Sequence, residues 1–213
     1  MGKVCGRNID KLSKGAMKLL LLKLYYRIRA TFLRLSGVTL GKGCTVSGSI
    51  FIRKADNSVI RLGDHCTLHS LRRFNPIMGS QLCLCTGCPG AEISFGAYSG
   101  MSGGAIYCVK SITIGEKTII GADCLIMDTD CHYPAPNGMW ASSFHEADRG
   151  EPVHIGKSCF IGARSIILKG VTIGDHSVIA AGSVVNQDIP PYSLAGGNPI
   201  RIRPLPKHWL PIE

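Results

Sequence analysis

His132 is the residue whose type and setting most favour catalysis. Histidine side chains titrate near neutral pH and can take a proton from a hydroxyl group, which typically contributes about 10²–10⁴-fold to a rate. Asp128 and Asp130 precede it by four and two residues, and strand alternation would put all three side chains on one face. A carboxylate beside an imidazole fixes its tautomer and stabilises the imidazolium. We therefore predict His132 as general base, Asp130 as its catalytic partner and Asp128 as a contact for the substrate that loses the proton, although either aspartate could bind that substrate.

The cysteines offer a second kind of chemistry. Cys131 could be a thiol nucleophile, but strand alternation turns it to the face opposite His132. Residues 1–14 are polar and basic and lack the pattern of a secretion signal, so we expect a cytoplasmic protein whose ten cysteines remain thiols. The densest group, at 83–88, has no second Cys or His pair at ligand spacing, and we predict no metal site there.

A period of six residues runs through most of residues 38–190 and must decide the fold. In the longest run the aliphatic positions are Ile155, Ile161, Ile167, Ile173, Ile179 and Val185. The next residue is usually small, as in Gly156, Gly162, Gly174 and Ala180, and the fifth place holds Cys159, Ser165, Val171, Ser177 and Ser183. Upstream, the same phase appears at Leu40, Val46, Ile52, Leu62, Leu68, Ile114, Ile120 and Ile126. His132 takes the next aliphatic place, which indicates that function overrides packing there.

A hexad is long enough for only one short strand and one turn, so the repeats are expected to stack as a parallel β-helix. Aliphatic side chains would fill its narrow core, and small residues in the fifth place would fit its corners, as for Cys44, Cys66, Cys124 and Cys159. The phase breaks twice. Proline, asparagine and glycine between Ile126 and Ile155 predict a loop that leaves the helix, and residues 72–90 predict a distorted coil.

Positive charge is concentrated at the start of the chain. Eight of the ten net charges lie in residues 1–36, and the balance elsewhere disfavours nucleic-acid binding. Good helix formers from Lys14 to Leu35, followed by Gly37, predict one basic amphipathic helix. Its uncharged run at 19–22 is far shorter than the roughly 20 residues that cross a bilayer. Two compatible interpretations stay open: the helix packs across the end of the β domain, or it makes peripheral contact with an anionic membrane.

Three phrases carry a resemblance to a known family: Ile126-Met-Asp-Thr-Asp-Cys-His132-Tyr-Pro, Ile155-Gly-Lys-Ser-Cys-Phe-Ile-Gly-Ala, and Ile189-Pro-Pro-Tyr-Ser-Leu-Ala-Gly-Gly-Asn-Pro-Ile-Arg-Ile-Arg203. They resemble the hexapeptide-repeat acyltransferases, particularly the maltose and galactoside O-acetyltransferase branch, over residues 38–203. The resemblance implies an all-β, left-handed parallel β-helix that forms a homotrimer with active sites at subunit interfaces. We divide the chain into a helical segment (1–36), a β-helix domain (37–190, with the protruding loop at 133–154) and a C-terminal tail (191–213).

The resemblance also implies an activity. In that family, a histidine at the start of the protruding loop takes the proton from an acceptor hydroxyl as it attacks the acetyl thioester, and His132 matches that position. The galactoside enzymes carry an asparagine upstream that is missing here, so Ser102 is the expected substitute, with Trp140 a further acceptor contact. The expected acceptor is a sugar or saccharide, such as a cell-envelope or polysaccharide precursor.

Acetyl-CoA is the implied acyl donor. Matching to the family places Ala163 and Ala181 along the pantetheine arm, where small side chains leave room. The positions matched to the adenosine phosphates are Asn186, Gln187 and Arg201. Arg201 is chemically the best of these because a guanidinium pairs well with phosphate. The family usually has a lysine where Gln187 stands, and Lys169 is the expected substitute.

Other functions on this kind of solenoid are weighed on the same residues, because the fold alone does not define an activity. A γ-class carbonic anhydrase needs histidines at metal spacing, and His132, His145 and His154 have the wrong intervals. A serine acetyltransferase needs a larger helical domain than 36 residues supply. A xenobiotic acetyltransferase stays open. So does a non-catalytic β-helix scaffold, although a scaffold would be expected to keep an aliphatic at position 132 and to lack the loop.

Overall fold

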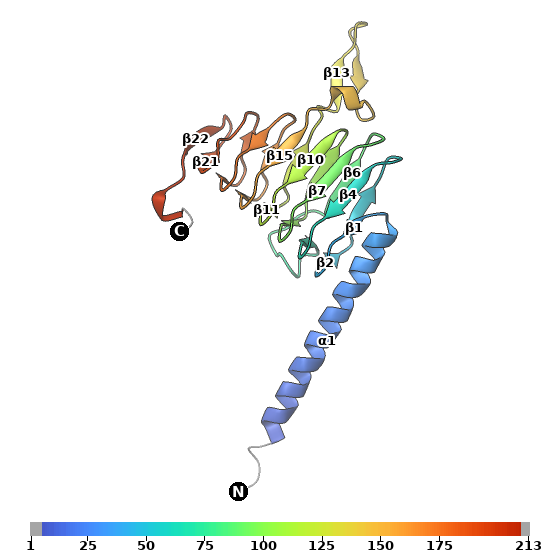
Figure 1. Ribbon diagram of the computed structural model, residues 1–213, viewed down its shortest axis with the longest axis vertical. Coiled ribbons are helices and arrows are strands. Elements are labelled where there is room, and N and C mark those ends of the chain that lie inside the picture. Colours follow the sequence, from blue (N-terminus) through green and yellow to red (C-terminus); the bar gives the residue numbers. More distant parts are fainter. Residues whose placement is uncertain (1–5, 210–213) are drawn as a thin grey trace.

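The computed structural model describes residues 6–209 and consists of a triangular β-solenoid with one long helix at its first coil (Figure 1). Each complete coil contributes one short strand to each of three parallel sheets. Sheet A contains β1 (Thr39–Leu40), β4 (Val59–Leu62), β7 (Glu92–Phe95), β10 (Ser111–Ile114), β15 (Val153–Ile155) and β18 (Thr172–Ile173). The chain passes from sheet A to B to C and back, so the solenoid has three edges, the A–B, B–C and C–A corners.

The other two sheets follow the same order. Sheet B contains β2 (Thr45–Gly48), β5 (Thr67–Ser70), β8 (Gly100–Ser102), β11 (Ile119–Ala122), β16 (Phe160–Ile161), β19 (Val178–Ile179), β21 (Ser193–Gly196) and β22 (Arg201–Pro204). Sheet C contains β3 (Phe51–Arg53), β6 (Cys83–Thr86), β9 (Ala105–Cys108), β12 (Leu125–Met127), β17 (Ile166–Ile167) and β20 (Val184–Val185). This architecture confirms the predicted parallel β-helix.

The hexad pattern has a direct structural cause. Every aliphatic of the run from Ile155 to Val185 is fully buried. The glycines that follow the aliphatic positions sit against the backbone of the next coil: a Cβ on Gly121 would lie 2.6 Å from the Ala163 nitrogen, and one on Gly63 would lie 2.7 Å from the Ala97 nitrogen. Larger side chains are therefore excluded at these corners because the coils stack too closely.

The fifth place of the hexad does more than accommodate a small side chain. Ser165 donates a hydrogen bond to the Ala180 carbonyl at 3.1 Å, and Ser177 donates to the Pro190 carbonyl at 2.9 Å. The thiols of Cys124 and Cys159 are buried and donate to the Gly162 and Gly174 carbonyls, each at 3.2 Å. Serine and cysteine recur at these corners because each links its own coil to the next one.

The helix α1 (Gly6–Leu35) begins eight residues before the predicted start and ends as expected. Gly37 has a φ of +80° and its N–H donates to the Arg34 carbonyl, which is a common way for a helix to end. Near this end, Ala30 and Leu33 are buried against the first coil, and the Tyr25 hydroxyl accepts a hydrogen bond from Gly48 N–H at 2.8 Å. The opposite end of α1 extends away from the solenoid (Figure 1). Within residues 6–209, no helix is both long and apolar enough to cross a membrane.

Two predicted boundaries need correction, and one regular coil lies where the sequence gives no clear phase. The solenoid does not end at residue 190, because β21 and β22 continue sheet B through Pro204. Residues 92–108 form a regular coil of β7, β8 and β9, although the six-residue phase is hard to recognise there. The expected distorted coil at 72–90 is an excursion at the B–C corner over residues 71–82, after which β6 resumes regular pairing.

Candidate active site

A hairpin rises from the C–A corner between β12 and β15 and carries His132 at its base (Figure 1). Its antiparallel strands are β13 (His132–Pro134) and β14 (Trp140–Ser142), followed by the short 3₁₀ helix η1 (Ala147–Arg149). His132 pairs with Ser142, and Pro134 pairs with Trp140. These two pairs are two residues apart, so His132 and Trp140 share one face of the hairpin. Trp140 is 75% exposed, and its indole can stack on a sugar or another flat ligand.

The imidazole of His132 is held by packing while its nitrogens remain accessible. Its ring lies edge-on to the Phe144 ring, with centroids 5.4 Å apart. Phe144 is fixed in turn by Tyr107 of β9, whose ring is perpendicular to it and whose hydroxyl donates to the Phe144 carbonyl at 2.7 Å. Among residues 6–209, neither ring nitrogen of His132 is engaged in a hydrogen bond. The ring is therefore oriented and also free to accept a proton from a substrate.

The predicted partnership of Asp130 with His132 does not occur within one chain. The Asp130 carboxylate pairs instead with Lys169 Nζ at 2.7 Å. Lys169, on the following coil, also pairs with Glu151 at 3.0 Å. Asp130 and Glu151 are the two ends of the hairpin, so one ammonium group clamps both. Hydrogen bonding to the two carboxylates, Asp130 foremost, raises the pKa of Lys169 above its ordinary value.

The same contacts correct the expected role of Lys169. Its positive charge is already matched by two carboxylates, which disfavours the predicted contact with a coenzyme phosphate. Lys169 instead belongs to the group of residues that position the hairpin. Two further contacts support the hairpin base: Thr129 and Ser143 hydroxyls lie 3.1 Å apart, and Ser143 N–H donates to the Cys131 carbonyl at 2.8 Å.

The assignment of Asp128 to the acceptor is wrong because the side chain is fully buried. Its carboxylate accepts hydrogen bonds from the backbone N–H groups of Val109 and Lys110, both at 2.7 Å, and from the Cys108 thiol at 3.3 Å. Burial raises the pKa of Asp128, while the backbone donors act in the opposite direction. The predicted alternation over 128–132 fails because β12 ends at Met127 and Cys131 has a φ of +65°.

A second group of predicted site residues lies at the B–C corner. Ser102 is the last residue of β8, whereas Ala163 and Ala181 follow β16 and β19; β11 lies between β8 and β16 in sheet B. Ala163 and Ala181 are one coil apart, and the Ala163 carbonyl accepts a hydrogen bond from Gly182 N–H at 2.9 Å. A Cβ at Gly182 would have no atom within 4 Å, so this corner is open. The three residues therefore form one column, on the edge of sheet C opposite His132.

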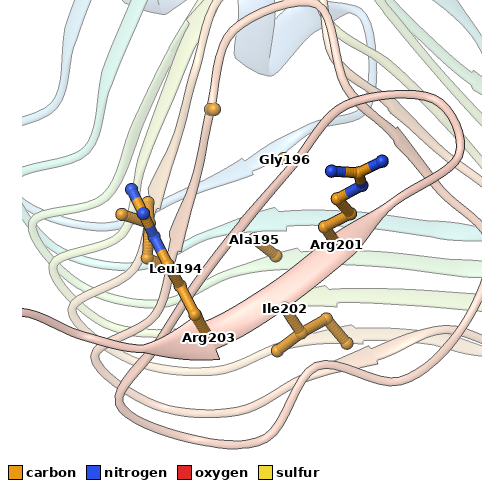
Figure 2. A pocket seen from close by; sticks show the side chains of 7 residues that line it. Leu194, Ala195, Gly196, Arg201, Ile202 and Arg203 are labelled. Atoms are coloured by element: carbon orange, nitrogen blue, oxygen red, sulfur yellow. The ribbon is translucent and has the colours of Figure 1, made fainter.

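Arg201 lies beside this column and lines a pocket of about 330 Å³ at the end of sheet B. Figure 2 shows the guanidinium groups of Arg201 and Arg203 on the same side of β22, with Ile202 directed to the other. Ala180 and Gly196 complete the small-residue floor of the pocket. Two guanidinium groups over small side chains suit a phosphate-bearing ligand. Arg203 is a candidate contact that the sequence did not single out.

Asn186 and Gln187 do not join Arg201, contrary to the prediction that grouped them. They are exposed and follow β20, in the turn that leads back to sheet A, so they lie at the C–A corner. The predicted residues thus form two sets in each chain. His132, Asn186, Gln187 and Lys169 lie along the C–A corner, whereas Ser102, Ala163, Ala181 and Arg201 lie at the B–C corner.

The repeat also matches a known family model. Residues 152–187 match the family model described as "Hexapeptide repeat of succinyl-transferase". This match covers the last coils of the solenoid and agrees with the resemblance drawn from the motifs, and the three parallel sheets confirm the predicted parallel β-helix.

Particular relatives are similar over part of their length. The chain is 43% identical over 107 residues to the Staphylococcus aureus (strain COL) protein SACOL2570, which covers 43% of this chain and 54% of that protein. It is 37% identical over 94 residues to galactoside O-acetyltransferase of Escherichia coli (strain K12), covering 43% of each. The chain thus spans about half the length of the curated relatives it matches. A solved structure of AntD, an N-acyltransferase from Bacillus cereus, shares the fold at a TM-score of 0.56 and 19% identity, covering 84% of this chain and 89% of that one.

Proposed function

We propose that this protein is an acetyl-CoA-dependent O-acetyltransferase that acts on a hydroxyl group of a saccharide. The observation that carries the proposal is His132. It falls at the next aliphatic position of the six-residue sequence phase, its ring is oriented by Phe144, and its nitrogens are unoccupied by hydrogen bonds in the described chain. The sequence similarity to the galactoside enzyme supports the choice of reaction.

The proposed reaction is direct transfer. A ring nitrogen of His132 accepts the proton of the acceptor hydroxyl as its oxygen attacks the thioester carbonyl carbon. The new C–O bond forms, the C–S bond breaks, and the imidazolium returns the proton to the departing coenzyme thiolate. Trp140, on the same face of the hairpin, would stack on the acceptor sugar and hold it near His132.

The B–C corner supplies the features that acetyl-CoA would need. Ala163 and Ala181 leave space for the pantetheine arm along the edge of the solenoid, and Arg201 with Arg203 would meet phosphate groups at its end. A donor bound there lies across sheet C from His132 of the same chain. The base and the donor site would therefore come from neighbouring subunits.

A homotrimer is the assembly we favour for this shared site. Outward-facing side chains of sheet A are mainly polar, such as Thr39, Arg61, Ser94, Thr113, His154 and Thr172. Those of sheet C are mainly apolar, namely Phe51, Cys83, Ala105, Leu125, Ile166 and Val184. Sheet B also exposes Ile119 and Phe160. Exposed apolar side chains on these two sheets suit association with further copies of the chain.

The acceptor class is the finer part of the proposal. The exposed, basic part of α1 supports an acceptor saccharide that lies close to an anionic membrane surface. It also supports action at that surface from the cytoplasmic side.

The test is release of coenzyme thiol from acetyl-CoA in the presence of sugars, nucleotide sugars and lipid-linked glycans, with mass spectrometry of the acceptor. A mass gain of one acetyl group on a saccharide supports the proposal. Hydrolysis or transfer that depends on no saccharide contradicts it. Light scattering tests the trimer, and a stable monomer would remove the shared site.

The shared site has its own test. His132→Ala and Arg201→Ala subunits, each impaired alone, are refolded together. If the site lies between subunits, mixed trimers regain transfer at interfaces with both wild-type groups. If each chain contains a whole site, mixing restores nothing.

A further inference from the structure

The helix α1 has an apolar stripe that the solenoid does not cover. Met17, Leu20, Leu21, Leu24, Ile28, Phe32 and Leu35 are all substantially exposed. At 3.6 residues per turn these positions fall within about a third of the helix circumference. The residues that pack on the solenoid, Ala30 and Leu33, lie on the other side. The helix therefore has one face for its own domain and one face without a partner in the chain.

Cations border this stripe on both sides. Lys23, Arg27 and Arg34 fall along one edge and Lys18 and Arg29 along the other. The sequence from Met17 to Leu35 contains no acidic residue. None of the ion pairs in the described chain includes a cation of α1. An apolar strip between two rows of long cationic side chains is the arrangement by which a helix lies in a lipid interface.

The B–C excursion 71–82 extends the same surface. Leu71 and Ile77 are exposed, and Phe74 anchors the excursion to the helix. The Phe74 ring stacks on His69 at 5.6 Å, lies parallel to Tyr25 at 6.4 Å and packs at 5.8 Å from Tyr26. Helix and excursion thus form one fixed unit.

A groove of about 620 Å³ lies between these two elements. Its walls are Leu21, Leu22, Tyr25, Leu71 and Phe74, and its only charged lining residues are Lys18 and Arg73. The shape and chemistry suit a hydrocarbon chain with a negatively charged group at one end. That is the chemistry of an anionic phospholipid.

We propose that α1 and residues 71–78 form a binding surface for an anionic lipid bilayer, with a lipid chain in the groove and its phosphate near Lys18 and Arg73. A second copy of the chain is a poorer occupant of the stripe, because two such helices would bring cationic edges together with no acid to offset them. The inference rests on this surface alone and stands whether or not the chain transfers an acyl group.

The experiment is co-sedimentation of the full-length protein with vesicles of phosphatidylcholine, with and without phosphatidylglycerol, at low and high salt. Binding is expected only with phosphatidylglycerol and is expected to weaken with salt. Lys23→Gln/Arg27→Gln should weaken binding by roughly fivefold for each cation removed. The matched control Lys42→Gln/Lys110→Gln removes two exposed cations of the solenoid and should leave binding unchanged.

Exposed residues of α1 are varied, because deletion of the helix would also uncover the first coil, where Ala30 and Leu33 are buried. Leu24→Gln/Ile28→Gln should reduce vesicle binding, while Met139→Gln on the distant hairpin should not. Arg73→Gln tests the groove and should lower vesicle binding while the fold is unchanged. Equal binding of all variants, equal binding to pure phosphatidylcholine, or a change in oligomeric state caused by Leu24→Gln/Ile28→Gln would each overturn the proposal.

Discussion

The last coils of the solenoid and the hairpin beside them are built on different principles. In residues 152–187, position in the hexad decides whether a side chain is buried, faces a corner or faces out, and the same contacts recur each coil. In residues 128–151, almost every contact is singular: Asp128 caps two N–H groups, Lys169 clamps both hairpin ends, and Phe144 orients His132. The repeat therefore provides a rigid frame, whereas the hairpin that interrupts it carries the candidate catalytic residue.

Removal of the His132 side chain tests this division most strongly. His132→Ala should lower acetyl transfer by about 10²–10⁴-fold, because the general base is lost. The fold should persist because the ring is exposed. The readout is steady-state transfer together with circular dichroism, and His154→Ala, on the outer face of sheet A, is the matched control. Wild-type transfer by His132→Ala would show that the hairpin lacks the base.

Arg201→Ala tests the solenoid end as the donor site. Loss of a charge-assisted contact with phosphate should weaken acetyl-CoA binding by about 1.5–3 kcal/mol while the chemical step is retained. Calorimetric titration with coenzyme A measures the change, and Arg203→Ala compares the second guanidinium of the pocket. A fall in kcat without a change in affinity would contradict the assignment.

Gly115→Ala tests the stacking of the frame. The added Cβ would overlap the backbone of Gly156 in the next coil, where no flexible side chain can yield. We expect the free energy of unfolding to fall by about 1–3 kcal/mol, as in other overpacked sites. Urea denaturation measures it. Gly138→Ala, in the hairpin, meets no atom within 4 Å and isolates the cost of a positive φ.

Lys169→Ala tests whether the clamp positions His132. We expect transfer to fall by about tenfold, a loss of roughly 1.4 kcal/mol in transition-state stabilisation, with little change in global stability or acetyl-CoA affinity. Hydrogen exchange should increase in residues 130–151. Lys157→Ala is the control, because Lys157 pairs with Asp175 at 3.6 Å away from the hairpin. A selective loss of acetyl-CoA affinity would instead support the coenzyme contact expected from sequence.

The pH dependence of the clamp follows from the raised pKa of Lys169. A lysine whose folded pKa is raised contributes its stabilisation fully below its unfolded pKa and loses it as pH rises through the folded value. The hairpin should therefore stay clamped at neutral pH and loosen only in strongly alkaline solution. Loss of hydrogen-exchange protection in residues 130–151 on mild acidification would contradict this expectation.

The solenoid could be predicted from the sequence because the surroundings of each residue depend on its position in the six-residue repeat. A hexad aliphatic such as Ile167 can only point inward once coils stack, and a corner residue such as Gly162 must be small. The tail was misjudged because β21 and β22 pair as an antiparallel addition that has no repeat signal. The coil at residues 92–108 has no clear hexad signal because its phase does not continue that of either neighbour.

The hairpin contacts were beyond sequence reasoning for a different reason. Asp130 and Lys169 are 39 residues apart, and only the stacking of successive C–A corners brings them to 2.7 Å. Asp128 looks like Asp130 in sequence, yet β12 ends at Met127 and Cys131 has a φ of +65°, so the alternation assumed over 128–132 is absent. Residue type and spacing could identify the candidate histidine, but they could not tell which of the two aspartates was buried.

Both long excursions leave the solenoid at corners and return to the strand that the unbroken helix would have used next. Residues 71–82 join β5 to β6, and the hairpin joins β12 to β15, without a shift in the pairing of the neighbouring coils. Corners therefore act as insertion points at which new segments can be gained during evolution at little cost to the frame. If the hairpin holds the acceptor as proposed, a change of acceptor can arise by exchange of the hairpin alone, while the column of small residues on the opposite edge stays the same.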